Sequence, residues 1–148
     1  MAIVEDLKLI HIKTLSLFDL GEEQLVKTYG PGKWSIQFIL HHLADAESVL
    51  YDRIRRTISN PGQVVWGFDQ DAWAAALDYD VKPLSISRSV YSACREGIIY
   101  LAEDNYEEKG DSHMIHSGDG RKTLKDVFDK VVWHNKKHLT QIEQALKS

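Results

Sequence analysis

Hydrophobic residues recur every three or four positions along most of this 148-residue chain. That spacing predicts amphipathic helices, and four long stretches carry it, at about residues 3–18, 35–60, 84–103 and 124–148. A shorter helix is expected at 70–76. Nothing alternates with period two for long enough to demand a sheet, although 63–66 could be a brief extended piece. We therefore predict an all-α fold, a four-helix bundle with a short extra helix.

Capping residues and prolines mark the ends of these helical segments. Ser35 and Asp69 are good N-caps, Ser85 is a candidate cap, and Thr123 with Asp126 resembles a capping box. The three prolines fall between the helical patterns, as helix breakers should. Residues 105–122 are polar and contain three glycines, so we expect a long loop there, of a length that is often functional.

Composition and charge narrow the class of protein. Hydrophobic residues make up 43% and charged residues 27%, which suits one globular domain over residues 1–148. The formal net charge is −4 and no stretch gathers cations alone, so we expect no nucleic-acid partner. No apolar run has the length of a membrane span, and the N-terminus does not resemble a signal peptide. Cys94 is the only cysteine, expected to be a buried, inert thiol, and a reducing cytoplasm fits it.

Two histidines interrupt the apolar seam of the last helix. His134 and His138 are four residues apart, so their imidazoles leave the same side of that helix. Seven histidines placed at random would give about 0.3 pairs at this separation, so the spacing alone is weak evidence for a metal site. The ordinary alternative is a pair of core histidines, each bonded to a backbone carbonyl or an acid.

The second helix offers a third imidazole. His41 and His42 are adjacent and therefore point about 100 degrees apart. His42 shares its row with Phe38 and Ala46, so it should face inward, whereas His41 shares a polar row with Asp45 and should face water. His11 on the first helix is a competitor that could equally be a packed core histidine. His113 and His116 lie in the expected loop, where exposure is the default.

A set of His42, His134 and His138 would suit particular metals. Three histidines without a cysteine favour Zn²⁺, Ni²⁺ or Fe²⁺ over a structural thiolate site. Three protein ligands also leave coordination positions open for water or substrate, as in catalytic sites.

The same residues resemble a known family. The segments PGKWSIQFILHHLADAE (31–47) and VVWHNKKHLTQI (131–142) resemble the two signatures of the DinB superfamily, and the closest likeness within it is to YfiT-like metal-dependent hydrolases. FDQDAWA (68–74) supports that subgroup, and so, more loosely, does the stretch from His116 to Leu124. The likeness spans nearly the whole chain.

The resemblance implies a bundle with an up-down-down-up course and metal ligands at His42, His134 and His138. It implies nickel or zinc as cofactor and a homodimer. It also implies an enzyme that acts on a small-molecule substrate. The activity would be either hydrolysis or thiol S-transfer, the latter with a low-molecular-weight thiol such as bacillithiol. The match is poor around His116, where Ser117 and Gly118 replace a usual proline and acid, so no role is assigned to His116.

The catalytic residues stay unknown at this level. Asn135 follows His134, so this is not a His-Glu-x-x-His arrangement, and no general base is evident. Asp45, expected to be solvated, and Glu47 could each orient an imidazole. A non-enzymatic metal-binding module is the third possibility. Trp66, Trp73 and Trp133 could line a pocket or a dimer interface, although core packing is the commoner use of tryptophan.

Overall fold

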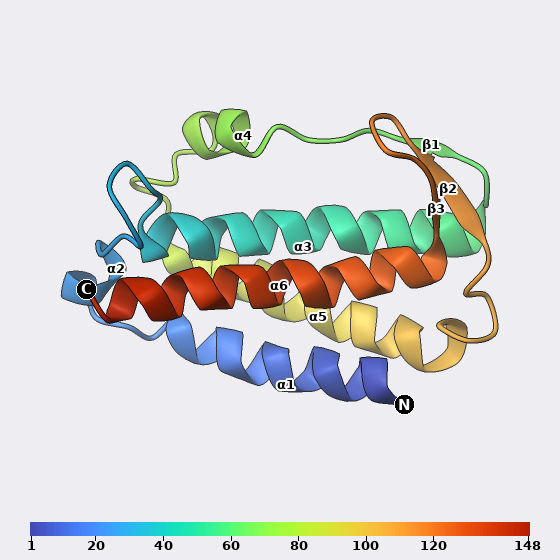
Figure 1. The fold of residues 1–148 in the computed structure, drawn as a ribbon, viewed down its shortest axis with the longest axis horizontal. Coiled ribbons are helices and arrows are strands. Elements are labelled where there is room, and N and C mark those ends of the chain that lie inside the picture. Colours follow the sequence, from blue (N-terminus) through green and yellow to red (C-terminus); the bar gives the residue numbers. More distant parts are fainter.

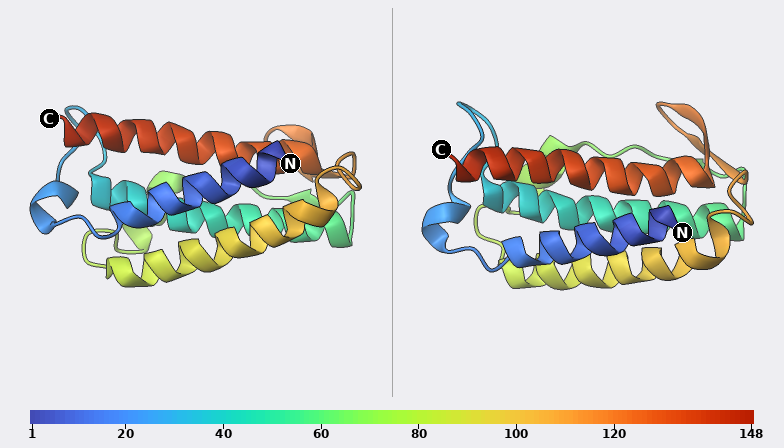
Figure 2. Two further views of the ribbon diagram at one scale, coloured as in Figure 1. Left: turned by 90° about the horizontal axis from the view of Figure 1, so that it is seen from below. Right: turned by 60° about the horizontal axis from the view of Figure 1, so that its bottom comes forward.

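The computed structural model describes all residues, 1–148. Its four long helices are α1 (Ala2–Leu17), α3 (Ile36–Ser59), α5 (Leu84–Asn105) and α6 (Leu124–Leu146). Helices α1 and α6 run in one direction and α3 and α5 in the other, so the course is up-down-down-up (Figure 1). Helix α3 packs on α5 and α6, and α1 packs across the same two helices (Figure 2). The predicted four-helix bundle is therefore confirmed.

Two short helices and a small sheet complete the chain. Helix α2 spans Glu22–Leu25, and α4 (Gln70–Ala76) is the predicted short helix. Strands β1 (Val64–Val65), β2 (His113–His116) and β3 (Gly120–Thr123) form a sheet in the order β1-β2-β3. Strand β1 is parallel to β2, and β2 is antiparallel to β3. The long connection from α3 to α5 carries β1 and α4 over one face of the bundle (Figure 1).

The expectation of a long loop at 105–122 is wrong for its second half, which is a β-hairpin. Its strands have only four residues each, so they are too short to display a clear alternation. Gly120 adopts a φ of 77°, a conformation that suits glycine at the start of the returning strand. Gln63 and Val65 accept hydrogen bonds from Ile115 and Ser117, so the hairpin is tied to the segment that follows α3.

The helix caps account for most of the boundaries. The Ser35 hydroxyl accepts from Phe38 N, Asp69 caps α4, and the capping box of Thr123 and Asp126 is present. Ser85 is not a cap, because α5 begins one residue earlier, after Pro83, and no side chain caps it. Proline fits there because its fixed φ suits the entry to a helix.

The bundle interior contains a set of hydrogen-bonded polar side chains, which we call the buried polar network. Arg95 on α5 is fully buried and forms an ion pair with Glu47 on α3. Its Nη2 also donates a hydrogen bond of 2.7 Å to Asn135 Oδ1 on α6. Asn135 donates to Thr14 on α1 and accepts from the Tyr91 hydroxyl. One network thus joins all four long helices, and its two buried charges, Arg95 and Glu47, neutralise each other.

Three expectations about side-chain burial are wrong. Cys94 is only half-buried, because its neighbour Arg95 takes the inward position on α5, and partial burial raises the pKa of its thiol. Trp66 is 78% exposed and Trp133 is 60% exposed, so neither indole serves as a core residue.

No helix is both long and apolar enough to cross a membrane.

Candidate metal centre

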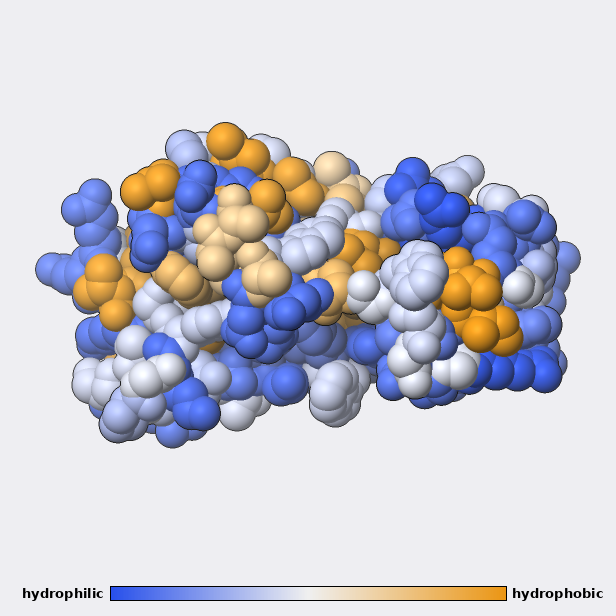
Figure 3. Space-filling view, turned by 90° about the horizontal axis from the view of Figure 1, so that it is seen from above, coloured by the Kyte–Doolittle hydropathy of each residue, from blue (hydrophilic) through white to orange (hydrophobic).

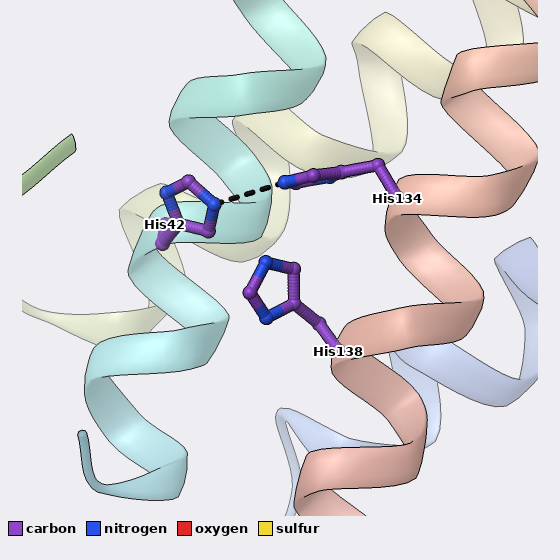
Figure 4. Close-up of side chains that lie close together, drawn as sticks. All are labelled: His42, His134 and His138. Atoms are coloured by element: carbon purple, nitrogen blue, oxygen red, sulfur yellow. Dashed lines mark hydrogen bonds between the residues drawn. The ribbon is translucent and has the colours of Figure 1, made fainter. Parts of the chain in front are cut away.

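Three imidazoles meet between α3 and α6. His42 comes from α3, and His134 and His138 come from successive turns of α6 (Figure 4). The Nε2 atoms of His42 and His134 are 3.0 Å apart, and one nitrogen from each of the three rings lies within 4.8 Å of the others. We call this set the histidine cluster. Its spacing is that of donor atoms arranged around a single ion.

The folding of the two helices explains this convergence. The Ser35 cap sets the start of α3, and seven residues later His42 lies on the face that packs against α6. Helices α3 and α6 run in opposite directions as neighbours (Figure 1), and His42 meets His134 near the middle of α6. The i, i+4 spacing then aims both His134 and His138 at His42.

His138 is held in one tautomer. Its Nδ1 lies 2.7 Å from Gln141 Oε1, an oxygen that only accepts, so Nδ1 carries the proton. The other nitrogen, Nε2, is buried without any hydrogen-bond partner and points toward the other two rings (Figure 4). A buried lone pair without a partner costs free energy unless something binds it. A metal ion at the centre of the cluster would satisfy it, and a bond from the opposite nitrogen is the usual support for a ligating histidine.

All three imidazoles have lowered pKa values. Burial, with smaller contributions from His138 and Lys137, lowers the pKa of His42 to about 3. Burial and the two neighbouring histidines lower the pKa of His134 to about 2. Burial also lowers the pKa of His138, although its bond to Gln141 opposes the shift. The cluster is therefore neutral at pH 7, which is the form that binds metals.

Aromatic side chains and a cavity surround the cluster. The rings of Trp34 and Phe68 lie 5.3 and 6.3 Å from that of His42, centroid to centroid. A cavity of about 230 Å³ reaches His138 and Gln141, with Asp71 and Lys137 at its wall. Helix α4 and the hairpin stand above this face of the bundle toward its two ends (Figure 1), and Figure 3 shows the same face from above. The cluster is thus flanked by aromatic groups on the His42 side, and a cavity reaches it at His138.

The prediction that His41 faces water is wrong. Its side chain is fully buried, its Nδ1 lies 2.7 Å from Ser87 Oγ on α5, and its ring packs on Tyr79. The reason is that α5 and the segment around Tyr79 pack on the polar row of α3, so that row is buried as well. His41 nevertheless points away from the histidine cluster, and only His42 joins it.

The acids of α3 do not orient the cluster. Asp45 is buried, not solvated, and accepts a hydrogen bond from the Tyr79 hydroxyl. Glu47 pairs with Arg95 in the buried polar network. The suggestion that either acid holds an imidazole is therefore wrong. Gln141 has that position instead, and sequence reasoning missed it, although its place three residues after His138 was a usable signal.

The remaining histidines lie elsewhere. His11 Nε2 is 3.2 Å from Ser92 Oγ, between α1 and α5. His113 and His116 are half-buried in the hairpin, so their expected exposure is only partly correct. His116 Nδ1 accepts from the backbone N–H groups of Gly118 and Asp119, both at 3.0 Å, and thus stabilises the hairpin turn.

Comparison with known proteins agrees with the geometry. The model of the DinB superfamily matches residues 12–142. This chain belongs to the DinB superfamily. That match includes the histidine cluster and the whole of α3 and α5, together with α1 from residue 12 onward and α6 as far as residue 142.

Proteins similar to this chain occur in bacteria. Two proteins of Oceanobacillus iheyensis, each named "putative metal-dependent hydrolase", are similar to this chain. One is 32% identical over 86% of this chain and 73% of its own length, and the other is 29% identical over 97% and 82%. The solved structure of YfiT from Bacillus subtilis superimposes with a TM-score of 0.89, at 20% identity, over 99% of this chain and 85% of YfiT. YfiT is described as a "probable metal-dependent hydrolase with an unusual four-helix bundle topology", and the likeness here is one of fold.

Proposed function

We propose that this protein is a divalent-metal-dependent hydrolase whose metal ligands are His42, His134 and His138. The observation that carries the proposal is the convergence of three neutral imidazoles, with Nε2 of His138 buried and unpaired. The names of the relatives support the metal-dependent hydrolase class.

Each residue of the site has a part in this proposal. A divalent ion, when bound, lowers the pKa of water toward about 7 and polarises a carbonyl or leaving group. Gln141 fixes the tautomer of His138, and the rings of Trp34 and Phe68 exclude water from the His42 side. With three protein ligands, coordination positions stay free for the substrate. A small-molecule substrate fits the cavity of about 230 Å³ that reaches His138.

The first test is the metal content of the protein. Protein purified without chelator or histidine tag should hold close to one equivalent of Ni²⁺ or Zn²⁺ by mass spectrometry. His42→Ala, His134→Ala and His138→Ala should each abolish most of the binding, because each removes one of three ligands. His41→Ala is the matched control, since His41 points toward Ser87. Less than about a tenth of an equivalent in the wild type, even after metal is added, would refute the proposal.

The rival function is thiol S-transfer, in which a low-molecular-weight thiol replaces water as the nucleophile. It is favoured by one observation: no carboxylate belongs to the histidine cluster, and a metal-bound thiol loses its proton without a protein base. A chromogenic electrophile, offered with and without a panel of small thiols, separates the two. Turnover with water alone supports hydrolysis, and thiol-dependent turnover supports transfer. No turnover in either assay favours a non-enzymatic metal-binding module.

Three finer points stay predictions. Nickel or zinc is expected because three imidazoles suit both ions. A homodimer is expected from the family resemblance, and light scattering coupled to gel filtration would measure it, with a mass of one chain contradicting it. A cytoplasmic location is expected from the single, half-buried cysteine.

A further inference from the structure

A second cavity, separate from the one at His138, lies between α3, α6 and the hairpin. Its volume is about 380 Å³, which is in the range of small-molecule sites. Arg53 of α3, Lys122 of β3 and Lys130 and Trp133 of α6 line it, together with three aspartates. We call it the hairpin cavity. The function proposed above makes no use of these cations.

Arg53 is the unusual residue of this cavity. Its side chain is only 5% exposed, yet its guanidinium pairs with no carboxylate. Its single hydrogen bond, of 2.9 Å, goes to the backbone oxygen of Trp66. The nearest acid on its own helix, Asp52, is taken by Arg55 and Arg56. A buried cation without a hydrogen-bonded ion-pair partner is costly, and in this Arg53 differs from Arg95, which pairs with Glu47.

No acid of the hairpin cavity forms an ion pair with Arg53, although the charges of Asp119 and Asp52 partly offset the effect of burial, which lowers its pKa. Asp126 Oδ2 accepts from Thr123 N as part of the capping box, at 2.9 Å. Asp129 Oδ1 accepts from the Tyr106 hydroxyl at 2.8 Å. Asp119 is exposed and lies 3.8 Å from His116 Nδ1. Lys122 and Lys130 form no ion pair either; partial burial and Arg53 lower the pKa of Lys130, and Asp119 opposes that shift. The cavity therefore has free cationic groups.

The position of the cavity connects it to the histidine cluster. Lys130 precedes His134 by one helical turn, about 6 Å along α6, and Arg53 lies about 16 Å beyond His42 along α3. Trp133 lines the cavity and is the direct neighbour of His134. The cavity and the cluster therefore lie about one helical turn apart along α6.

We propose that the hairpin cavity is an anion subsite, in which Arg53 and Lys130 bind a carboxylate or phosphate group of the substrate whose reacting group lies at the histidine cluster. The guanidinium of Arg53 suits such planar or tetrahedral oxyanions, because its remaining donors form a fork. The indole of Trp133 provides apolar surface for the part of the substrate between the two ends. The substrate class is then a small acid or phosphorylated compound, and this part rests on the proposed function.

The first experiment tests the anion subsite without metal or turnover. Metal-free, ¹⁵N-labelled protein is titrated with inorganic phosphate and with succinate, and the shifts of the Arg53 Nε–H and Trp133 Nε1–H signals are followed by NMR. Both signals should shift and saturate. Arg53→Gln should weaken phosphate binding at least tenfold, and Lys130→Gln several-fold. The matched control is Arg55→Gln, an exposed arginine on the same helix, which should bind as the wild type does.

Several results would overturn the proposal. The first is the absence of saturable shifts of the two NMR signals. The second is an unchanged affinity for phosphate in both Arg53→Gln and Lys130→Gln. The third is an equal loss of phosphate affinity in Arg55→Gln, which would indicate a general effect of charge. If Arg53→Gln does not fold, the phosphate affinity of Lys130→Gln decides, because Lys130 is exposed and its replacement leaves the core intact. Preference for phosphate over succinate, or the reverse, identifies which acidic group the subsite takes.

A second experiment links the subsite to the reaction. The metal-loaded enzyme is offered a neutral p-nitrophenyl ester and one of equal length that ends in a carboxylate. The ratio of kcat/KM for the acidic over the neutral ester should fall at least tenfold in Arg53→Gln and stay constant in Arg55→Gln. If neither ester is cleaved, the proposed hydrolysis fails, while the phosphate titration still decides the anion subsite. An unchanged ratio in Arg53→Gln would refute the link between them.

Discussion

The two ring nitrogens of His138 have different partners, and this difference can be tested at the scale of one residue. Gln141 Oε1 holds the proton on Nδ1 and leaves Nε2 free. We predict that Gln141→Ala weakens Zn²⁺ or Ni²⁺ binding about 10- to 100-fold, the usual cost of losing such a support. A competition titration against a chromophoric chelator would measure it. Thr140→Ala, the exposed neighbour, should bind metal normally, and equal affinity in both variants would contradict the role of Gln141.

The low pKa of His42 makes a prediction for the metal-free protein. In the unfolded chain His42 takes up a proton below about pH 6.5, whereas burial keeps it neutral in the folded state down to about pH 3. The neutral ring therefore contributes stability that is fully present above pH 6.5 and is lost as the pH falls toward 3. From pH 7 to pH 5 the loss due to His42 is at most about 2 kcal/mol.

Urea denaturation in the presence of chelator, at pH 7 and at pH 5, checks this estimate. His42→Asn lacks the titrating group, so its stability should fall less than that of the wild type over the same interval. Parallel losses in the two proteins would show that His42 does not carry the effect.

The sequence could predict which residues form the histidine cluster, but not all of their surroundings. The helical spacing and the apolar row pointed to His42, His134 and His138 correctly as a group that meets. The burial of His41 could not be seen, because it depends on how closely α5 covers α3. The polar row of His41 indicated solvent, whereas Ser87 and Tyr79 provide buried polar partners.

At the scale of the elements, the buried polar network holds the four long helices in register. We predict that Arg95→Met destabilises the fold by about 3–5 kcal/mol, because it leaves Glu47 charged and unpaired in the interior. The double variant Glu47→Met with Arg95→Met should be more stable than Arg95→Met alone. Denaturant unfolding gives all the values. Lys8→Met is the control, since the exposed pair of Lys8 and Glu103 should contribute less than about 1 kcal/mol.

The capping box and Ser35 show why helix ends were easier to predict than strands. A cap is a local contact within three residues, so its sequence signal is complete in itself. The hairpin depends on β1, some fifty residues away, which pairs with β2 and completes the sheet. Strands of two and four residues carry too little periodicity to reveal that pairing.

At the scale of the whole molecule, the course of the chain sets the site. The pattern of apolar residues predicts four helices but not which of them run in the same direction. In this bundle α3 lies antiparallel to α6, so that His42 meets the i, i+4 pair, and the same arrangement places Arg53 beside Lys130 in the hairpin cavity (Figure 1). Only the resemblance to the DinB superfamily carried that information before the structure.

An ion held between α3 and α6 would link two helices that are remote in sequence, and it would bind the folded state alone. Binding at a free metal concentration of 100 times Kd adds about 2.7 kcal/mol to the free energy of unfolding. For a chain of this size, we predict that chelator-treated protein gains about 5–10 °C in Tm when Zn²⁺ or Ni²⁺ is added. Thermal unfolding followed by circular dichroism measures the shift.

The variants separate this site from adventitious binding at the surface. His42→Asn and His138→Asn should lose the metal-induced shift even if their Tm without metal differs from that of the wild type. His113→Asn, on the hairpin, should keep it, because His113 is not part of the histidine cluster. A shift of equal size in His42→Asn would mean that the ion binds elsewhere. If both cluster variants lose the shift and His113→Asn keeps it, the ion must contact α3 and α6 at once. Neither helix alone could hold the ion with the same affinity.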